Sequence, residues 1–161
     1  MHYAFTYERI GVIVGPWWEP GPPRERGARV EVRLAPDQPR RGSPSAAQLV
    51  VLDDPIFRAD LFDHEEGTPG NLRAAHFHEG FDGVEPRDRQ WPRELKHDPI
   101  AWLRDELSDL PNVLTRSGFT ILDEDVVRRD TEALRQSLDA IASAVESTWL
   151  YVRSQPVASN H

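Results

Sequence analysis

Residues 134–152, LRQSLDAIASAVESTWLYV, decide the fold of the C-terminal half of the chain. The apolar side chains recur at spacings of 4, 3, 4, 4 and 3: Leu134, Leu138, Ile141, Val145, Trp149 and Val152. This repeat is typical of one face of an α-helix that packs on a core. It predicts a helix that starts near residues 123–125, ends before Pro156 and is about 40–45 Å long at 1.5 Å per residue.

A second amphipathic helix is predicted upstream of this one. Asp98 is a favourable N-cap, and Pro99 stands at the first helical position. Apolar residues then follow at spacings of 3, 4 and 3: Ile100, Leu103, Leu107 and Leu110. We expect this helix to end near Pro111, with a short helical turn as far as Gly118.

The first half of the chain instead alternates apolar and polar residues with period two, the pattern of strands that have one buried face. Strands are expected over residues 3–14 (bent near Gly11), 30–34, 48–52, 56–62 and 72–78. Proline-rich segments are expected to be loops, at residues 15–27 and 35–46.

Strands followed by helices predict an α+β fold. We expect a mostly antiparallel sheet of about four or five strands in the N-terminal half, covered by two C-terminal amphipathic helices. The chain of 161 residues fits a single domain. Its expected parts are a sheet over residues 1–80, a loop-rich connection over 81–97 and helices over 98–155.

Composition excludes several classes of function. There is no Cys, hence no disulfide framework and no thiolate ligand or nucleophile. The net charge of −8 disfavours nucleic acid as a partner, because phosphate binding needs a basic face. The basic cluster of residues 24–41 is interpreted as a solvated loop and strand edge. No apolar run approaches the roughly 18 residues of a membrane span, and no signal peptide is recognised, so we expect a cytoplasmic protein without a membrane partner.

Side chains suited to chemistry concentrate in residues 58–98, which hold four of the six His. His76 and His78 form an H-x-H pair, and residues two apart on a strand point to the same face. Arg58 and Asp60 are likewise two apart on the preceding predicted strand. If the loop at residues 64–71 joins the two strands as an antiparallel hairpin of even register, all four side chains share one face. Two imidazoles and a carboxylate are ligands suited to a divalent metal ion.

The segment G-x5-H-x-H-x3-D, formed by Gly70, His76, His78 and Asp82, resembles the first metal-binding motif of the cupins, with Asp where that family has Glu. The resemblance implies that the two His and Asp82 bind a divalent metal. It covers about 13 residues and does not extend to the cupin jelly-roll. The second cupin motif is absent, and residues 98–153 are predicted to be helical.

Two hypotheses of function from different classes follow. The first is a non-catalytic accessory or protein-interaction module that acts as a homodimer or with a protein encoded in the same operon. Its basis is the long terminal amphipathic helix together with the lack of a complete catalytic signature. Motifs for binding nucleotide cofactors, such as G-x-G-x-x-G and G-x4-G-K-[ST], are absent.

The alternative is a metal-dependent enzyme that uses the H-x-H site. Its ligands would be His76 and His78, with Asp60 or Asp82 as the third, and Arg58 would hold an anionic substrate. Arg58 and Asp60 are therefore the candidate catalytic residues. They could equally form a salt bridge of little energetic weight. A third hypothesis is a domain that binds a small anion through Arg58 and Arg73.

Overall fold

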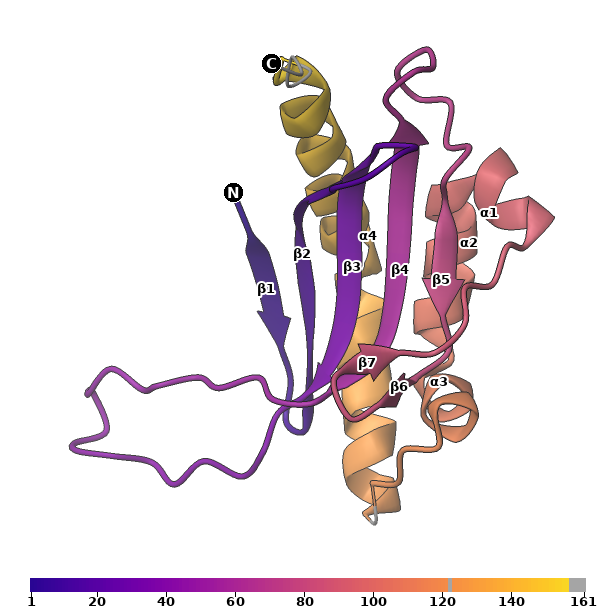
Figure 1. The fold of residues 1–161 in the computed structure, drawn as a ribbon. Coiled ribbons are helices and arrows are strands. Elements are labelled where there is room, and N and C mark those ends of the chain that lie inside the picture. Colours follow the sequence, from indigo (N-terminus) through magenta and orange to yellow (C-terminus); the bar gives the residue numbers. More distant parts are fainter. Residues whose placement is uncertain (122, 157–161) are drawn as a thin grey trace.

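The computed structural model describes residues 1–121 and 123–156. Its N-terminal half forms an antiparallel five-stranded sheet in which neighbouring strands follow chain order (Figure 1). The strands are β1 (Tyr3–Thr6), β2 (Ile10–Glu19), β3 (Glu25–Leu34), β4 (Pro55–His64) and β5 (His76–His78). A separate two-stranded pair follows, β6 (Phe81–Asp82) and β7 (Glu85–Pro86). The predicted α+β class and the antiparallel sheet are confirmed.

Four helices follow the strands within the described residues: α1 (Arg93–His97), α2 (Pro99–Ser108), α3 (Leu110–Ser117) and α4 (Glu124–Ser154). The expectation of two covering helices is therefore not confirmed. Asp98 caps α2 as predicted, and Asp109 followed by Pro111 starts a new helix, α3, where a single turn was expected. Asp123 caps α4, which spans the predicted range.

Several strand predictions were wrong. Residues 15–27 were expected to be a loop, but they contain the end of β2 and the start of β3. Pro16 is tolerated in β2 because β1 pairs with β2 only as far as Val14, so this part of β2 lies at the sheet edge, where no outer N–H is needed. Residues 48–52 form no strand and lie in a long loop that projects from the sheet (Figure 1).

Two other predicted strands have different lengths. Residues 3–14 do not form one strand. They form β1 and the first part of β2, which pair with each other across a turn at residues 7–9. The strand predicted at residues 72–78 is reduced to β5. Loop 35–46 lacks helix and strand, as expected.

Helix α4 covers one face of the sheet, and α2 packs against α4. Figure 1 shows α4 lying along the back of β2, β3 and β4. Its apolar stripe joins inward-facing residues of the strands in one core, and the Trp149 Nε1–H donates to the backbone carbonyl of Leu61 at 2.9 Å. Among the described residues, no helix combines the length and apolar character needed to traverse a bilayer. The opposite face of the sheet is left for polar side chains.

Asp130 on α4 ties the turn between β1 and β2 to the helix layer. Its buried carboxylate accepts the backbone N–H groups of Glu8 at 2.9 Å and Arg9 at 2.8 Å. These two bonds fix the turn that divides the first predicted strand in two.

We predict that Asp130→Ala lowers the free energy of unfolding by about 2–4 kcal/mol, because two backbone donors lose a charged acceptor. Urea denaturation monitored by tryptophan fluorescence measures the change. Asp139→Ala, which removes only an exposed ion pair with Arg104, is the control and should change stability by less than about 1 kcal/mol. Equal effects of the two substitutions would contradict the assignment.

Candidate metal centre

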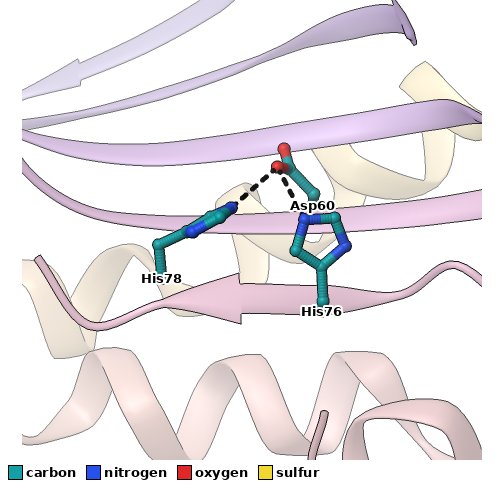
Figure 2. Close-up of side chains that lie close together, drawn as sticks. All are labelled: Asp60, His76 and His78. Carbon is teal, nitrogen blue, oxygen red and sulfur yellow. Dashed lines mark ion pairs between the residues drawn. The ribbon is translucent and has the colours of Figure 1, made fainter. Parts of the chain in front are cut away.

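The polar face of the sheet brings together Arg58, Asp60, His76 and His78. Strands β4 and β5 are antiparallel, with Asp60 opposite His76 and Arg58 opposite His78. The even register that places all four side chains on one face is thus confirmed. Figure 2 shows both imidazole rings turned from β5 toward the carboxylate on β4.

The Asp60 carboxylate and the two imidazoles form a buried triad. His76 Nε2 lies 3.3 Å and His78 Nε2 lies 3.7 Å from Asp60 Oδ2. The three ligand atoms all lie within 4.8 Å of one another, and the residues are 1%, 1% and 4% exposed for Asp60, His76 and His78. Ligands at about 2.0–2.2 Å from a tetrahedral ion are separated by roughly 3.3 Å, so only a small contraction would be needed to hold one.

Backbone carbonyls orient both rings. Nδ1 of His76 lies 2.7 Å from the carbonyl oxygen of Ala74, and Nδ1 of His78 lies 2.5 Å from that of Arg87. A carbonyl can only accept, so each Nδ1 carries the proton. Nε2 is then the nitrogen that each ring directs at Asp60. An Nδ1–H bound to a carbonyl is the usual orienting contact of a histidine that binds metal through Nε2.

Two guanidinium groups also contact the carboxylate. Arg29 on β3 donates from Nε to Oδ1 at 2.7 Å and from Nη2 to Oδ2 at 3.3 Å. Arg58 Nε lies 3.1 Å from Oδ2. Burial alone would raise the pKa of the Asp60 carboxyl. The contact with His76, together with the charge and hydrogen bonds of Arg29, outweighs that effect and holds the pKa well below its usual range.

Hydrogen bonding assigns the role of Nε2 in His78. The Nη2 group of Arg58 can only donate, and it lies 3.2 Å from His78 Nε2, so this nitrogen accepts. Nε2 of His76 is buried and has no hydrogen-bond partner. A buried polar nitrogen without a partner is costly, and a bound cation would satisfy it.

Aromatic side chains close the site from outside. The ring of Trp91 lies 4.9 Å from the ring of His76, and Phe62 meets His76 edge-on at 6.1 Å. Trp17 stacks on the guanidinium of Arg29 at 3.7 Å. A pocket of about 270 Å³ on the same face is lined in part by Trp17 and Arg29. Arg29 thus separates the pocket from Asp60.

The structure does not bring the other candidate residues to the triad. Asp82, the acid of the cupin-like motif, lies in β6 with its side chain exposed and paired with Arg87 at 3.2 Å. Asp60 takes the place next to the histidines. Arg73 is exposed in the segment before β5, and His97 is exposed at the end of α1.

Sequence reasoning missed Arg29 and Trp91. Arg29 was assigned to a solvated basic cluster, but β3 pairs with β4 so that Arg29 stands opposite Asp60. Its alternation with Val30 marked it as part of a polar strand face and was the available signal. Trp91 lies in a loop, so no periodicity in the sequence could have placed it over His76.

Comparison of the chain with family models, curated proteins and solved structures gives no match. The resemblance to the first cupin motif accordingly remains local. The described residues form an open five-stranded sheet backed by helices, as expected when the jelly-roll was excluded.

We predict that Asp60→Asn destabilises the metal-free protein by about 3–5 kcal/mol at pH 7, because the half-buried guanidinium groups of Arg29 and Arg58 lose the buried carboxylate that is their counter-ion. Since the folded-state pKa of Asp60 is depressed, its stabilisation is fully present above the unfolded-state pKa of about 3.9 and is lost as the pH falls below it. The gap between wild type and variant should therefore narrow below about pH 4.

Urea denaturation in EDTA between pH 3 and pH 7 measures both effects. Asp82→Asn removes an exposed carboxylate and should follow the wild-type curve. A constant gap between wild type and Asp60→Asn at all pH values would show that the carboxylate charge does not stabilise the fold.

Proposed function

We propose that this protein binds a divalent transition-metal ion through Asp60 Oδ2 and the Nε2 atoms of His76 and His78. The observation that carries the proposal is the buried Nε2 of His76, which has no hydrogen-bond partner and lies 3.3 Å from Asp60 Oδ2. A divalent cation between the three ligand atoms would be coordinated by each of them.

The ligand set fits Zn²⁺, Fe²⁺, Mn²⁺, Co²⁺ or Ni²⁺. Neutral imidazole nitrogens with a carboxylate suit these ions, whereas Mg²⁺ and Ca²⁺ prefer oxygen ligands. Three protein ligands leave at least one coordination position for water or substrate, as in catalytic sites. A bound ion would supply Lewis acidity and an activated water for hydrolytic chemistry.

The chain's own residues would position that chemistry. The carbonyls of Ala74 and Arg87 hold the two rings in the Nδ1–H form, and Arg29 fixes the carboxylate from the neighbouring strand. The aromatic cover of Trp91 and Phe62 limits the access of water. These features support a metal-dependent enzyme that acts on an anionic substrate.

We predict that protein purified without a His tag binds one equivalent of Zn²⁺, Mn²⁺, Fe²⁺, Co²⁺ or Ni²⁺, and that its melting temperature rises when the metal is added to EDTA-treated protein. The double substitution of His76 and His78 by Gln should abolish binding. His97→Gln, at an exposed histidine, is the matched control and should retain it.

Elemental analysis and thermal unfolding supply the two readouts. Circular dichroism shows whether the double variant keeps its fold. A metal-free protein whose melting temperature ignores all five ions would contradict the proposed function.

The non-catalytic interaction module is the second candidate, and one observation favours it. Large apolar side chains are exposed where β2 ends beside the last turn of α4: Trp18 at 41%, Leu150 at 71% and Tyr151 at 37%. The rings of Trp18 and Tyr151 meet at 6.3 Å. Exposed apolar side chains that adjoin one another are typical of interaction surfaces, and here the partner is proposed to be a second copy of the chain.

Under this second candidate, wild-type protein should elute with a mass of about twice its 18.4 kDa, and Leu150→Asp should elute as a monomer. The introduced charge would be buried without a partner at the interface. Light scattering coupled to size-exclusion chromatography measures both masses, with Leu49→Asp in the exposed loop as control. A monomeric wild type would contradict the candidate.

A further inference from the structure

Arg58 occupies two of the three atoms that would bind the ion. Its Nη2 lies 3.2 Å from His78 Nε2, and its Nε lies 3.1 Å from Asp60 Oδ2. Because His78 donates through Nδ1, its Nε2 has a single lone pair, which here accepts from the guanidinium. That lone pair cannot at the same time bind a metal. Arg58 and the ion therefore exclude each other at His78.

Electrostatic repulsion also opposes the simultaneous presence of the Arg58 guanidinium and the ion at the site. A divalent ion would add two positive charges where Asp60 already faces the guanidinium groups of Arg29 and Arg58. Another nearby carboxylate, Glu31, stands opposite Arg58 across the sheet but is paired with Arg33 at 2.8 Å. With the ion bound, the positive charges of the ion, Arg29 and Arg58 would outnumber the negative charge of Asp60. An anion is the ligand that would correct this excess.

Arg58 is the more weakly held of the two arginines. Arg29 makes two hydrogen bonds to the carboxylate and is covered by Trp17. Arg58 Nε is buried and makes no hydrogen bond, despite its contact with Asp60. The two side chains are similarly exposed, at 14% for Arg58 and 12% for Arg29, and the ring of Phe81 lies 5.7 Å from the Arg58 guanidinium. Arg58 can therefore move away from Asp60 and His78 while the contact between Arg29 on β3 and Asp60 on β4 is kept.

We propose that Arg58 competes with the metal ion for His78 Nε2 and Asp60 Oδ2, and that the displaced guanidinium binds an oxyanion at the open position of the ion. This inference rests on the metal site proposed above. Arg58 is then a positioning group that closes the site when no metal is bound and selects a carboxylate, sulfate or phosphate group when it is.

Cobalt titration of EDTA-treated protein tests the competition. Co²⁺ absorbs in the visible range in a way that reports its coordination, so binding is read directly. Arg58→Leu should bind Co²⁺ about tenfold more tightly than wild type or better, because the competing cation is gone and leucine cannot act as a ligand. Arg104→Leu removes an arginine whose partner is the exposed Asp139 on α4, and should bind like wild type.

Added anions test the second half of the proposal. Sodium sulfate and sodium acetate should each tighten Co²⁺ binding by wild-type protein, relative to sodium chloride at the same ionic strength. Neither salt should tighten binding by Arg58→Leu. A response to sulfate alone would assign the site to tetrahedral oxyanions, and a response to acetate alone would assign it to carboxylates.

The outcomes separate the two proposals. If wild type binds Co²⁺ and Arg58→Leu binds it equally or more weakly, the competition is refuted while the metal site stands. If oxyanions have no effect on wild type, the guanidinium does not bind the anion. If no folded variant binds Co²⁺, the metal site itself fails and the inference fails with it. Should Arg58→Leu not fold, Arg58→Lys replaces it, since lysine cannot bridge both atoms, and unchanged affinity would again refute the competition.

Discussion

The buried carboxylate of Asp60 is the constraint around which the polar face of the sheet is arranged. It accepts two hydrogen bonds from Arg29 on β3, contacts Arg58 on its own strand and faces both imidazoles of β5. A carboxylate that is 1% exposed requires cations around it, and this one has Arg29 from β3 and Arg58 from β4. Register, burial and charge at the site therefore depend on one another, because a slip of one residue in either pairing would turn the partners on that neighbouring strand to the other face.

Local patterns in the sequence predicted much of this arrangement. The apolar stripe from Leu134 to Val152 predicted the long helix. The period-two spacing of Arg58 with Asp60, and of His76 with His78, predicted that these side chains lie on one face of the sheet. The errors concern pairing between distant segments. Pro16 was taken to break a strand, although it lies where β2 has no outer neighbour. Arg29 was separated from Asp60 by 31 positions, and only the β3–β4 register brings them to 2.7 Å. Such contacts depend on tertiary packing, which a single sequence does not encode in its local periodicity.

The chemistry of the site follows from how Nε2 of each ring is satisfied. Both rings donate from Nδ1 to a backbone carbonyl, so both direct Nε2 toward the carboxylate. Arg58 satisfies His78 and leaves His76 unpaired. A metal ion would use both lone pairs and the carboxylate oxygen at once. The Arg58 guanidinium and a metal ion would each stabilise the carboxylate of Asp60 and Nε2 of His78. The guanidinium leaves Nε2 of His76 without a partner, whereas the ion would bind it.

Anomalous diffraction from crystals of the cobalt-loaded protein tests the central claim most directly. The account predicts one strong peak at about 2.0–2.2 Å from the Nε2 atoms of His76 and His78 and from Asp60 Oδ2, with the guanidinium of Arg58 displaced from His78. A peak at Asp82 or at another surface group, with Arg58 still bound to His78, would contradict it.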